Sequence, residues 1–363
     1  MRVAIAHDYL TQRGGAERVV LTMAEAFPEA PIYTSLFEPA GTYPEFADLD
    51  VRTSSLNRIG VLRRHHRYAL PFLARSFGST VIDADVVIAS SSGWAHGVTA
   101  PGAKKLVYCH SPARWLYLRD DYGTSAARRA AMRLFRSPLL RWDQAAAASA
   151  DSYLANSSVV QERIAQVYGI HSEVLHPPHV VNVDGRHSPM AQTEPGFFLV
   201  VSRLMGYKNV DAVIAAMSEL PAHRLIVVGE GPQRDSLVAA APDNVGFVRN
   251  VDDARLRWLY ANCLALVSAA HEDFGLTPIE AASFGKPSVT LSAGGFLDSV
   301  RPDQTGVFFD TPEPGSVAKA MLRAADHPWN EAELRSHAAR FSKKEFVLRL
   351  RSVVAALAVT DHS

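Results

Sequence analysis

Residues 271–281 read His-Glu-Asp-Phe-Gly-Leu-Thr-Pro-Ile-Glu-Ala, and they follow an apolar run at residues 263–267. The apolar run predicts a buried strand. Thr277 followed by Pro278 predicts that a helix begins there, because threonine caps helices and proline suits their first position. Glu272 falls in the connecting loop and Glu280 in the first helical turn. Carboxylates and free backbone N–H groups therefore converge where a strand leads into a helix. Open α/β sheets bind ligands at such points, and a helix N-terminus favours phosphate.

The same spacing also has a purely structural interpretation. Thr277 and Glu280 form the pattern of a capping box, in which the glutamate only satisfies backbone donors of its own helix. We favour a ligand site, because other patterns typical of phosphate binding occur at sensible spacing upstream.

The rest of the chain repeats this alternation of short apolar runs and helical patterns. The pattern predicts an α/β fold with largely parallel sheets covered by helices. Helical segments are expected near residues 16–26 and at 340–359. The expected strands are residues 2–7, 86–90, 106–110, 151–156 and 173–176 in the first half and 197–202, 224–228, 245–247, 263–268 and 288–291 in the second.

Residues 177–195 are rich in proline, glycine and polar residues, a composition typical of a linker. They separate an N-terminal domain at residues 1–176 from a C-terminal domain at residues 196–339, each of ordinary domain size. We expect two Rossmann-like, doubly wound domains that face each other across a cleft, which is a usual place for a small-molecule site. Residues 340–363 are expected to form a helix that packs back on the N-terminal domain.

The composition is that of a globular protein: 48% of the 363 residues are hydrophobic and 20% are charged. No apolar run approaches the roughly 18 residues expected of a transmembrane helix. The apolar stretch at residues 1–7 is too short for a signal peptide and indicates a first buried strand. Cys109 and Cys263 both lie within apolar runs. We expect them to be core residues of a reduced, cytoplasmic protein.

Positive charge is concentrated in residues 51–142, which contain 15 Lys and Arg against 4 Asp and Glu, a net charge of +11 in a chain whose total is zero. Large apolar residues are interleaved with these cations, and this mixture suits an anionic membrane surface. A solvated helical face with its apolar side in the core is the alternative. Nucleic acid is not an expected partner, because we find no recognisable binding motif. The cations cluster at residues 63–67 and at Arg128, Arg129, Arg133, Arg136 and Arg141, the second cluster lying among Leu134, Phe135, Leu139, Leu140 and Trp142.

Two cations follow the first strand of the C-terminal domain. Arg203 and Lys208 flank a turn that contains Gly206 and leads into a helix expected near Asn209. Two cations beside a helix N-terminus form an anion site, since arginine grips a phosphate with two parallel hydrogen bonds and lysine adds a point charge. A pair of exposed surface cations is the alternative.

Other strand ends carry residues that suit a ligand. Gly14 and Gly15 follow the first strand, and Gly229 ends a later strand in a Gly-Glu-Gly-Pro turn that is not a dinucleotide fingerprint. Glycines let backbone N–H groups approach a ligand oxygen, although each pair can also be a plain turn. His110 ends another strand, where a hydrogen-bonded structural role is the alternative. The Asp-x-Asp triplets at 48–50 and 83–85 precede strands, at the edge opposite a ligand crevice, so we expect solvated loop ends and no metal site.

The ordered set of these patterns resembles the retaining glycosyltransferases of family 4, which have the GT-B fold of two facing Rossmann-like domains. The resemblance runs over nearly the whole chain, and the N-terminal part is most similar to bacterial O-antigen and exopolysaccharide mannosyltransferases. One departure is Arg249-Asn250, where relatives often have a glycine near the nucleobase pocket. The segments that carry the resemblance are 7–10 with 14–19, 108–112, 202–208, 229–232 and 272–280.

The resemblance implies that the N-terminal domain binds the acceptor and the C-terminal domain the donor nucleotide. It also implies roles for single residues. Those expected to be catalytic are His110 beside the donor sugar, Arg203 and Lys208 on the diphosphate, and Glu272 near the reaction centre. Those expected to bind the donor, besides Arg203 and Lys208, are Gly14, Gly15, Gly229, Phe274, Gly275, Leu276 and, at the ribose, Glu280.

Cleaving a sugar–phosphate bond builds positive charge on the sugar and negative charge on the departing diphosphate, so fixed cations stabilise the transition state. The resemblance implies a hexosyltransferase that retains configuration by front-face attack, with no covalent role for Glu272 and no metal or other cofactor. We expect GDP-mannose as donor and a lipid-linked or glycan acceptor of cell-surface polysaccharide or glycolipid synthesis, used in the cytoplasm or at the inner face of its membrane. A UDP-sugar donor, a sugar-nucleotide epimerase or phosphorylase of the same fold, and a non-catalytic nucleotide-sugar binding module are the alternatives.

Overall fold

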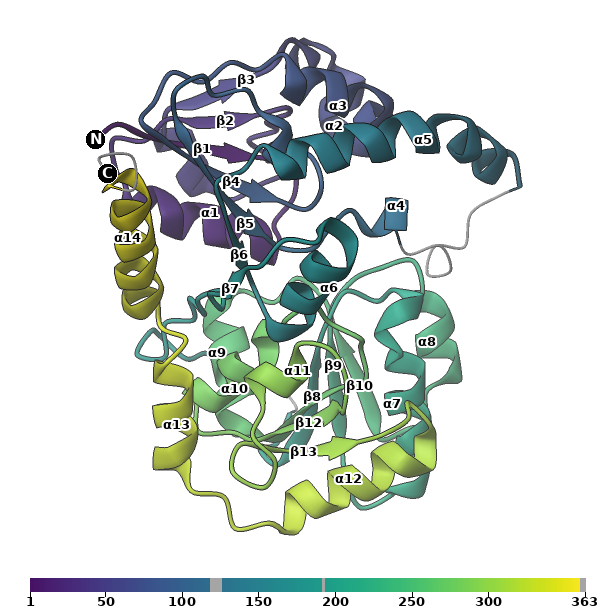
Figure 1. Cartoon of the computed structure of the whole chain (residues 1–363). Coiled ribbons are helices and arrows are strands. Elements are labelled where there is room, and N and C mark those ends of the chain that lie inside the picture. The colour runs from purple at the N-terminus through teal and green to yellow at the C-terminus, as the bar shows by residue number, and fades with distance from the viewer. Residues whose placement is uncertain (118–125, 191–192, 360–363) are drawn as a thin grey trace. The chain divides into compact units, whose positions relative to one another are not determined.

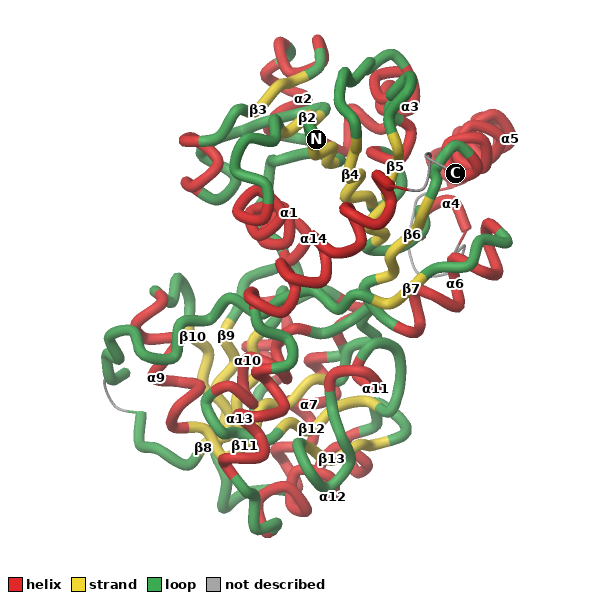
Figure 2. Tube along the Cα trace, turned by 60° about the vertical axis from the view of Figure 1, so that its left-hand side comes forward, coloured by secondary structure: helices red, strands yellow, loops and turns green. Residues whose placement is uncertain are grey.

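The computed structural model describes residues 1–117, 126–190 and 193–359, except the side chains of residues 67, 115 and 126–135. The chain divides into two compact units (Figure 1). The first consists of Met1–Pro178 together with the helix that begins at Lys343, and the second of His179–Ser342. Each unit is built on its own parallel sheet, drawn in yellow in Figure 2 with the helices in red.

The described part of the first unit contains a seven-stranded parallel sheet in the order β3-β2-β1-β4-β5-β6-β7. The chain runs outwards from β1 to β3 and then crosses back to β4 on the other side of β1. This reversal makes the point between β1 and β4 a topological switch point, where the strand ends leave room for a ligand. The strands are β1 (Val3–His7), β2 (Ile32–Thr34), β3 (Val51–Thr53), β4 (Val86–Ser91), β5 (Lys104–Cys109), β6 (Ser152–Ala155) and β7 (Glu173–Val174).

Helices cover both faces of this sheet. Alternate residues of a strand point to opposite faces, so Ile5 and Ile88 join one core with α1 and α14, while Ala4 and Val87 join another with α3, α5 and α6. Nε of Arg351 in α14 donates to the carbonyl oxygen of Ala26 at the end of α1, at 2.9 Å. The helices are α1 (Gly15–Ala26), α2 (Gly60–Arg64), α3 (Leu70–Gly78), α4 (Arg114–Tyr117), α5 (Ala126–Ala148), α6 (Ser158–Tyr168) and α14 (Lys343–Val359).

The second unit repeats the plan with a parallel sheet in the order β10-β9-β8-β11-β12-β13 among its described residues. Its switch point lies between β8 and β11. One face packs against α7 and α12, and the other against α9 and α10. The strands are β8 (Phe197–Val201), β9 (Leu225–Val228), β10 (Val245–Val248), β11 (Cys263–Ser268), β12 (Ser288–Leu291) and β13 (Gly306–Phe309). The helices are α7 (Val210–Ala216), α8 (Arg234–Ala240), α9 (Asp253–Asn262), α10 (Leu276–Ser283), α11 (Phe296–Ser299), α12 (Pro314–Asp326) and α13 (Glu331–Ala339).

The predicted fold class, two Rossmann-like parallel-sheet domains, is confirmed. All predicted strands occur, and no end is displaced by more than two residues. Three short strands, β2, β3 and β13, were not predicted. Cys109 and Cys263 are buried, as predicted. None of the described helices is both long enough and apolar enough to cross a bilayer.

The segment predicted as a linker, residues 177–195, is divided between the units. The boundary follows Pro178, and the described residues from His179 on belong to the second unit. Val181, Val183 and Met190 pack against the core beside α9 and α10, although the described residues of the segment form no helix or named strand. Its proline and glycine content therefore marks irregular backbone rather than a free connection. At the other end, the unit continues to Ser342 rather than to residue 339.

Candidate functional site

Two loops that flank the switch point of the second unit hold a lysine–glutamate pair. Lys208 ends the 3₁₀ turn η5 (Gly206–Lys208) after β8, and Glu272 lies in the loop after β11. The Lys208 ammonium donates to Oε1 of Glu272, and the two side chains are 11% and 28% exposed. The pair keeps some contact with solvent, so a ligand can reach it. The structure thus joins two predicted site residues that are 64 positions apart in the sequence.

Asn209 fixes the position of the lysine's turn. Its backbone has a left-handed φ of 49°, which asparagine tolerates better than most residues. Its Nδ2 donates to the carbonyl oxygen of Ala269, directly after β11, at 3.0 Å. This bond ties the turn of Lys208 to the start of the loop of Glu272. The sequence indicated only a helix start at Asn209, and α7 does begin at Val210.

Arg203 lies on the same loop as Lys208 but outside the lysine–glutamate pair. Its side chain is exposed, and its Nη2 lies 3.4 Å from the hydroxyl oxygen of Tyr207. The structure therefore places the two predicted diphosphate ligands on one loop without bringing their charged groups into a common contact. Arg203 stays a predicted ligand.

The helix after the glutamate loop begins earlier than predicted. α10 starts at Leu276 with Gly275 as its N-cap, so Thr277 lies inside the first turn and is not the cap. The cause is tertiary, because Gly275 has a φ of 86° and any Cβ there would come within 2.4 Å of the Phe296 ring. The predicted cap at Thr277 was wrong, and the capping-box interpretation of Glu280 depended on it. Phe274 buries its ring against Phe341, and its predicted backbone contact with the donor stays a prediction.

Glu280 is held by a tyrosine from the neighbouring helix α9. The hydroxyl of Tyr260 donates to Oε2 of Glu280 at 2.7 Å. Tyr260 is fully buried, and its ring stacks on Phe284 with a centroid distance of 5.5 Å. No pattern in the sequence marks Tyr260, since the contact joins two helices. Tyr260 orients the carboxylate that is predicted to meet the ribose.

We expect Tyr260→Phe to raise the KM for the nucleotide donor by roughly 10-fold with little change in kcat, because a hydrogen bond to a charged group contributes about 1.5–3 kcal/mol. The phenylalanine keeps the stack on Phe284, so the fold should persist. Steady-state kinetics and calorimetry with the nucleotide measure the effect. Tyr117→Phe is the matched control, since Tyr117 donates to the Asp143 carboxylate at 2.6 Å in the other unit. An equal rise in KM in both variants would contradict the assignment.

A pair of glycines after β12 supports the glutamate loop and was missed in the sequence. The N–H of Gly295 donates to the carbonyl oxygen of Glu272 at 2.9 Å. A Cβ on Gly295 would lie 2.2 Å from Cα of Phe274, and one on Gly294 would lie 2.3 Å from the carbonyl oxygen of Glu272. Gly294 also has a φ of 62°. Only glycines allow the two backbones to pack this closely.

Gly229 and Gly231 do the same for the loop that carries Arg203. A Cβ on Gly229 would lie 1.8 Å from the carbonyl oxygen of Ser202, and one on Gly231 would lie 2.2 Å from that of Leu204. The structure therefore shows a supporting role for Gly229, while its predicted contact with the donor stays a prediction. Beyond β10, Arg249 pairs with Glu230 at 3.3 Å.

The first unit has its predicted glycines at the start of α1. Gly14 is the N-cap and Gly15 the first helical residue. The carboxylate of Glu17 lies at this same helix end, accepting a hydrogen bond from Nε2 of Gln12 at 3.1 Å. A Cβ on Gly14 would approach Oε2 of Glu17 to 2.5 Å. A phosphate near Gly15 would therefore share the helix N-terminus with the buried carboxylate of Glu17, a neighbour that no sequence pattern indicates.

His110 sits beyond β5, half-buried against the buried side chains of His7 and Ser90, beside the switch point of the first unit. Its Nε2 lies 2.8 Å from Oγ of Ser90, and Nδ1 of His7 lies 3.1 Å from the same oxygen. Burial lowers the pKa of His110 to about 3 and that of His7 to about 4, because the interior disfavours the imidazolium. The ring of His110 is therefore neutral, with one nitrogen that donates a hydrogen bond and one that accepts.

The lowered pKa values predict how the first unit responds to acid. Both folded-state values lie below that of an exposed histidine, so the stability they contribute is complete above about pH 6.5 and is lost as the pH falls towards 4 and 3. We expect the His110 ring to stay neutral from pH 9 to pH 5 in ¹⁵N NMR spectra of histidine-labelled protein. His110→Gln assigns the signal, and a titration midpoint between pH 6 and 7 would contradict the prediction.

Asp8 organises the loop after β4. Its two carboxylate oxygens accept hydrogen bonds from the N–H groups of Ser92 and Ala95, both at 2.7 Å. Burial raises the pKa of Asp8 to about 6, against the effect of these bonds. The ionised form is thus disfavoured in the folded state, and stability from this group rises as the pH falls through 6, opposite in sign to the histidines.

The Asp-x-Asp triplets have partners of their own. Asp83 accepts from the Arg2 guanidinium at 2.9 Å, and Asp85 accepts from the backbone N–H of Arg2 at 2.6 Å. Asp50 pairs with Arg52 at 2.7 Å. Within the described residues, no three His, Cys, Asp or Glu side chains are grouped as metal ligands. The prediction of a metal-free site remains a prediction.

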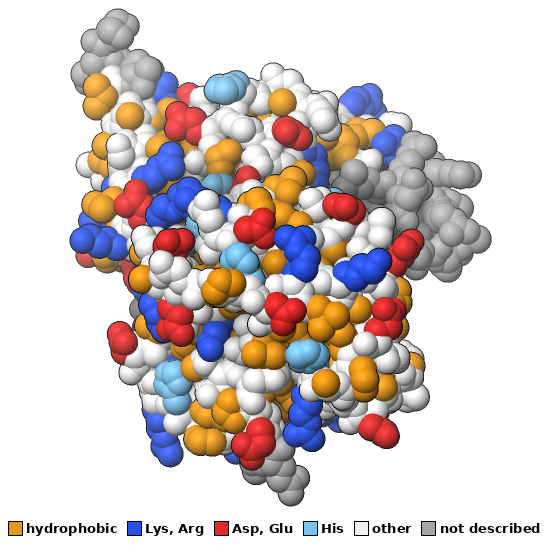
Figure 3. All heavy atoms as spheres, turned by 90° about the horizontal axis from the view of Figure 1, so that it is seen from below, with side chains coloured by type: hydrophobic (Ala, Val, Ile, Leu, Met, Phe, Trp, Pro, Cys, Tyr) orange, Lys and Arg blue, Asp and Glu red, His pale blue; other side chains and the backbone are white. Residues whose placement is uncertain are grey.

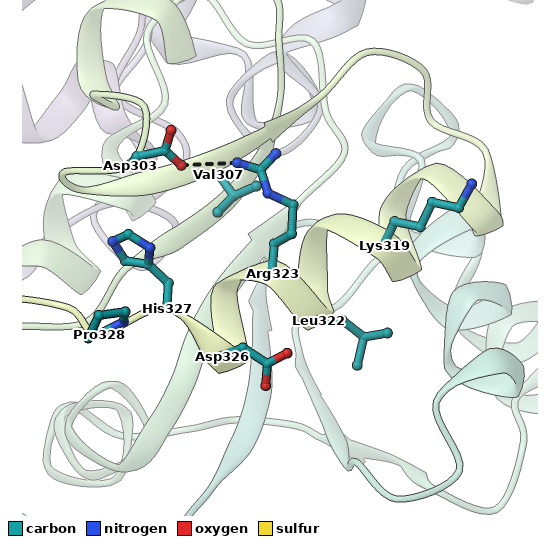
Figure 4. Close-up of a pocket in the computed structure, with 8 residues that line it drawn as sticks. All are labelled: Asp303, Val307, Lys319, Leu322, Arg323, Asp326, His327 and Pro328. Atoms are coloured by element: carbon teal, nitrogen blue, oxygen red, sulfur yellow. Dashed lines mark hydrogen bonds and ion pairs between the residues drawn. The ribbon is translucent and has the colours of Figure 1, made fainter.

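A surface pocket of about 570 Å³ lies between α12 and β13 of the second unit, away from these loops (Figure 4). Arg323 bridges it with an ion pair to Asp303 at 3.0 Å. None of the predicted site residues lines it. The lining consists of Asp303, Val307, Lys319, Leu322, Arg323, Asp326, His327 and Pro328.

Two family models match the chain in succession. Residues 13–184 match the model described as Glycosyltransferase Family 4, and residues 186–345 match the model described as Glycosyl transferases group 1. Among curated relatives, the glycogen synthase of Mycobacterium tuberculosis is 32% identical over 206 residues, which are 52% of this chain and 49% of that protein. The chain thus spans about half the length of the first of these relatives. The alpha-1,3/1,6-mannosyltransferase ALG2 of Dictyostelium discoideum is 24% identical over 425 residues, 98% of each chain.

Solved structures share the fold over the whole chain. Alr3699/HepE of Anabaena, in complex with UDP-glucose, superposes with a TM-score of 0.70 at 18% identity, over 98% of this chain and all of that one. The sucrose-phosphate synthase of Thermosynechococcus elongatus superposes with a TM-score of 0.71 at 19% identity, over 99% and 100% of the two chains.

Proposed function

Because the two halves of this chain belong to the family 4 and group 1 glycosyltransferases, we propose that it transfers a hexose from a nucleotide-sugar donor to an acceptor. The observation that carries the proposal is the Lys208–Glu272 pair at the switch point of the second unit. It combines a cation, which suits a diphosphate, with a carboxylate, which suits sugar hydroxyls or developing positive charge.

The chemistry of the reaction suggests a role for each candidate site residue of the second unit. Breaking the sugar–phosphate bond leaves negative charge on the diphosphate, and the Lys208 ammonium and the Arg203 guanidinium would stabilise it there. Glu272 would lie against the sugar, where positive charge develops. Glu280, oriented by Tyr260, would accept hydrogen bonds from the ribose. We further propose that the reaction needs no metal and retains configuration by front-face attack, with Glu272 forming no covalent bond.

Mannose, supplied as GDP-mannose, is the sugar that we propose. It is supported by the resemblance to bacterial mannosyltransferases and by the similarity to a mannosyltransferase over 98% of the chain. The second candidate is a UDP-sugar, since the structural neighbour Alr3699/HepE was solved in complex with UDP-glucose. Asn250 is relevant to the choice between the two nucleotides, because it stands where relatives often have a glycine near the nucleobase. Its φ of 48° is one that glycine adopts easily.

The acceptor that we propose is a lipid-linked or glycan molecule of cell-surface polysaccharide or glycolipid synthesis. We propose that the protein acts in the cytoplasm or at the inner face of the cytoplasmic membrane. An epimerase of the same fold would instead change the free sugar nucleotide without an acceptor. A binding module would hold the nucleotide without hydrolysing or transferring the sugar.

Calorimetry against GDP-, UDP- and ADP-sugars, followed by donor hydrolysis without acceptor, tests this proposal. We expect one nucleotide to bind in the presence of EDTA, and slow hydrolysis of its sugar. Binding of no nucleotide would refute the proposal. Binding without hydrolysis and without transfer to any acceptor would favour the binding module, and a changed sugar on an intact nucleotide would favour the epimerase.

A further inference from the structure

One stretch of the first unit is strongly cationic and contains no acid. Residues 51–82 include six arginines and no Asp or Glu. By contrast, acidic and basic side chains are interspersed over the face of the molecule drawn in Figure 3. The stretch forms α2, the 3₁₀ turn η3 (His66–Ala69) and α3 (Figure 1). Its electrostatic potential therefore favours anionic partners.

The same stretch exposes large apolar side chains, which a solvated helix face normally hides. Tyr68 is 64% exposed, Phe72 52%, Val61 52% and Ile59 51%. Arg64 and Arg75 are exposed among them. We name this set the α2–α3 surface: Ile59, Val61, Arg64, Tyr68, Phe72 and Arg75.

These apolar groups are not the core side of their helices. Leu62, Ala69, Leu73 and Phe77 take that role and are at most 8% exposed. Leu73 and Phe77 are four positions apart and point inwards, whereas Phe72 and Arg75 are three apart and point outwards. A second layer of apolar residues thus lies on the outer face, and the packed inner layer holds it in place.

The other cationic cluster of this unit behaves differently. Leu139 and Trp142 pack against the core, and the Trp142 ring lies 5.8 Å from that of Trp94. For these two residues of α5, the alternative to a membrane surface, a solvated helix with its apolar side in the core, is correct. The side chains of Arg128, Arg129, Arg133, Leu134 and Phe135 lie outside the described residues.

The α2–α3 surface is joined to the loop that precedes Gly14. The His66 ring stacks on that of Tyr9 at 4.4 Å, and its Nδ1 lies 3.2 Å from Oγ1 of Thr11. Arg63 reaches Glu38 at 3.5 Å. The surface therefore lies beside the carboxyl end of β1, at the edge of the sheet where the switch point opens.

We propose that the α2–α3 surface docks the first unit on an anionic lipid bilayer. The apolar side chains enter the interface and the arginines bind headgroup phosphates, the combination on which surface helices depend. The contacts of His66 place the bilayer next to the predicted acceptor side of the unit. This proposal rests on the proposed function in one respect: docking on a bilayer would bring the unit to a lipid-linked acceptor.

Vesicle sedimentation tests this with the full chain at low salt. Wild-type protein should bind vesicles of 30% phosphatidylglycerol in phosphatidylcholine but not pure phosphatidylcholine, and lose binding in ~0.5 M KCl as screening shortens to a few ångströms. Arg64→Ala with Arg75→Ala should weaken binding roughly 20-fold, at about five-fold for each arginine. Tyr68→Ser with Phe72→Ser should weaken it by a similar or larger factor.

Leu348→Ser with Arg349→Ala, on α14, is the matched control. Leu348 is 54% exposed, close to the 52% of Phe72, and the neighbouring Arg349 is exposed as well. This control should bind like wild type. No vesicle binding by wild type, unchanged binding by the α2–α3 variants, or an equal loss in the control would each overturn the proposal. Thermal unfolding, measured in parallel without vesicles, shows that each variant is folded, and absence of nucleotide binding in wild type would count against the proposed function alone.

Discussion

Lys208→Ala is expected to lower turnover at least ~100-fold while the protein stays folded, by analogy with the loss of an electrostatic donor to a transition state. The substitution removes the ammonium that is predicted to receive the charge of the leaving diphosphate. It also leaves Glu272 without the lysine that it contacts in the structure. Turnover measured at saturating donor, with thermal unfolding of the same sample, separates the chemical effect from loss of fold.

Two further variants sharpen this test. Lys208→Arg keeps the charge but changes its shape, so partial activity is expected. Lys104→Ala removes the lysine of another partly buried ion pair, with Asp151 at 3.4 Å in the first unit, and should leave turnover unchanged. Near-normal turnover in well-folded Lys208→Ala protein would refute the role assigned to this residue.

Gly294→Ala is expected to lower kcat/KM for the donor by roughly 100-fold, because a displacement of about 1 Å in a positioned catalytic group has effects of this size. The new Cβ would lie 2.3 Å from the carbonyl oxygen of Glu272, so the glutamate loop must move. Stability should fall by about 1–3 kcal/mol from the overpacking. Thermal unfolding and donor kinetics measure the two effects separately.

The matched control is Gly169→Ala. Gly169 ends α6 with a φ of 67°, close to the 62° of Gly294, and a Cβ there would meet no atom within 4 Å. It therefore carries the backbone strain, about 1–2 kcal/mol, without the collision. We expect Gly169→Ala to lose stability but keep its activity. Equal losses of activity in both variants would show that the strain, and not the contact with Glu272, is responsible.

The fold could be predicted from the sequence wherever a strand is an apolar run that leads into a glycine or a cap. β11 and β12 were predicted to the residue. β11 is apolar from Cys263 to Val267, and β12 alternates Val289 and Leu291 with Ser288 and Thr290 while being buried throughout. β2 and β3 have three residues each, too few to show a period. β13 was also missed, and its length is not the reason, because β12 has four residues as well and was predicted. The cap at Thr277 failed because local preference lost to the packing of Gly275 on Phe296.

The candidate site divides in the same way. Lys208 and Glu272 could each be predicted as site residues, since both follow apolar strands, whereas their contact depends on the strand order that only the structure shows. Asn209, Tyr260 and Gly294 could not, because each acts through a partner 20 or more positions away, and none has a chemistry that marks it in isolation. Residues that react are visible in a sequence, whereas the residues that hold them become visible only when the backbone is folded.

The helix α14 belongs to the first unit, although the chain reaches it only after completing the second. On the ribosome, every residue of the second unit is synthesised before this helix emerges. Until then Val20 and Met23 of α1 lack the cover that Leu350 and Val354 provide. A nascent chain should therefore display an apolar strip on α1 for as long as translation of some 160 residues takes, and the first unit can complete its core only when the last helix has been made.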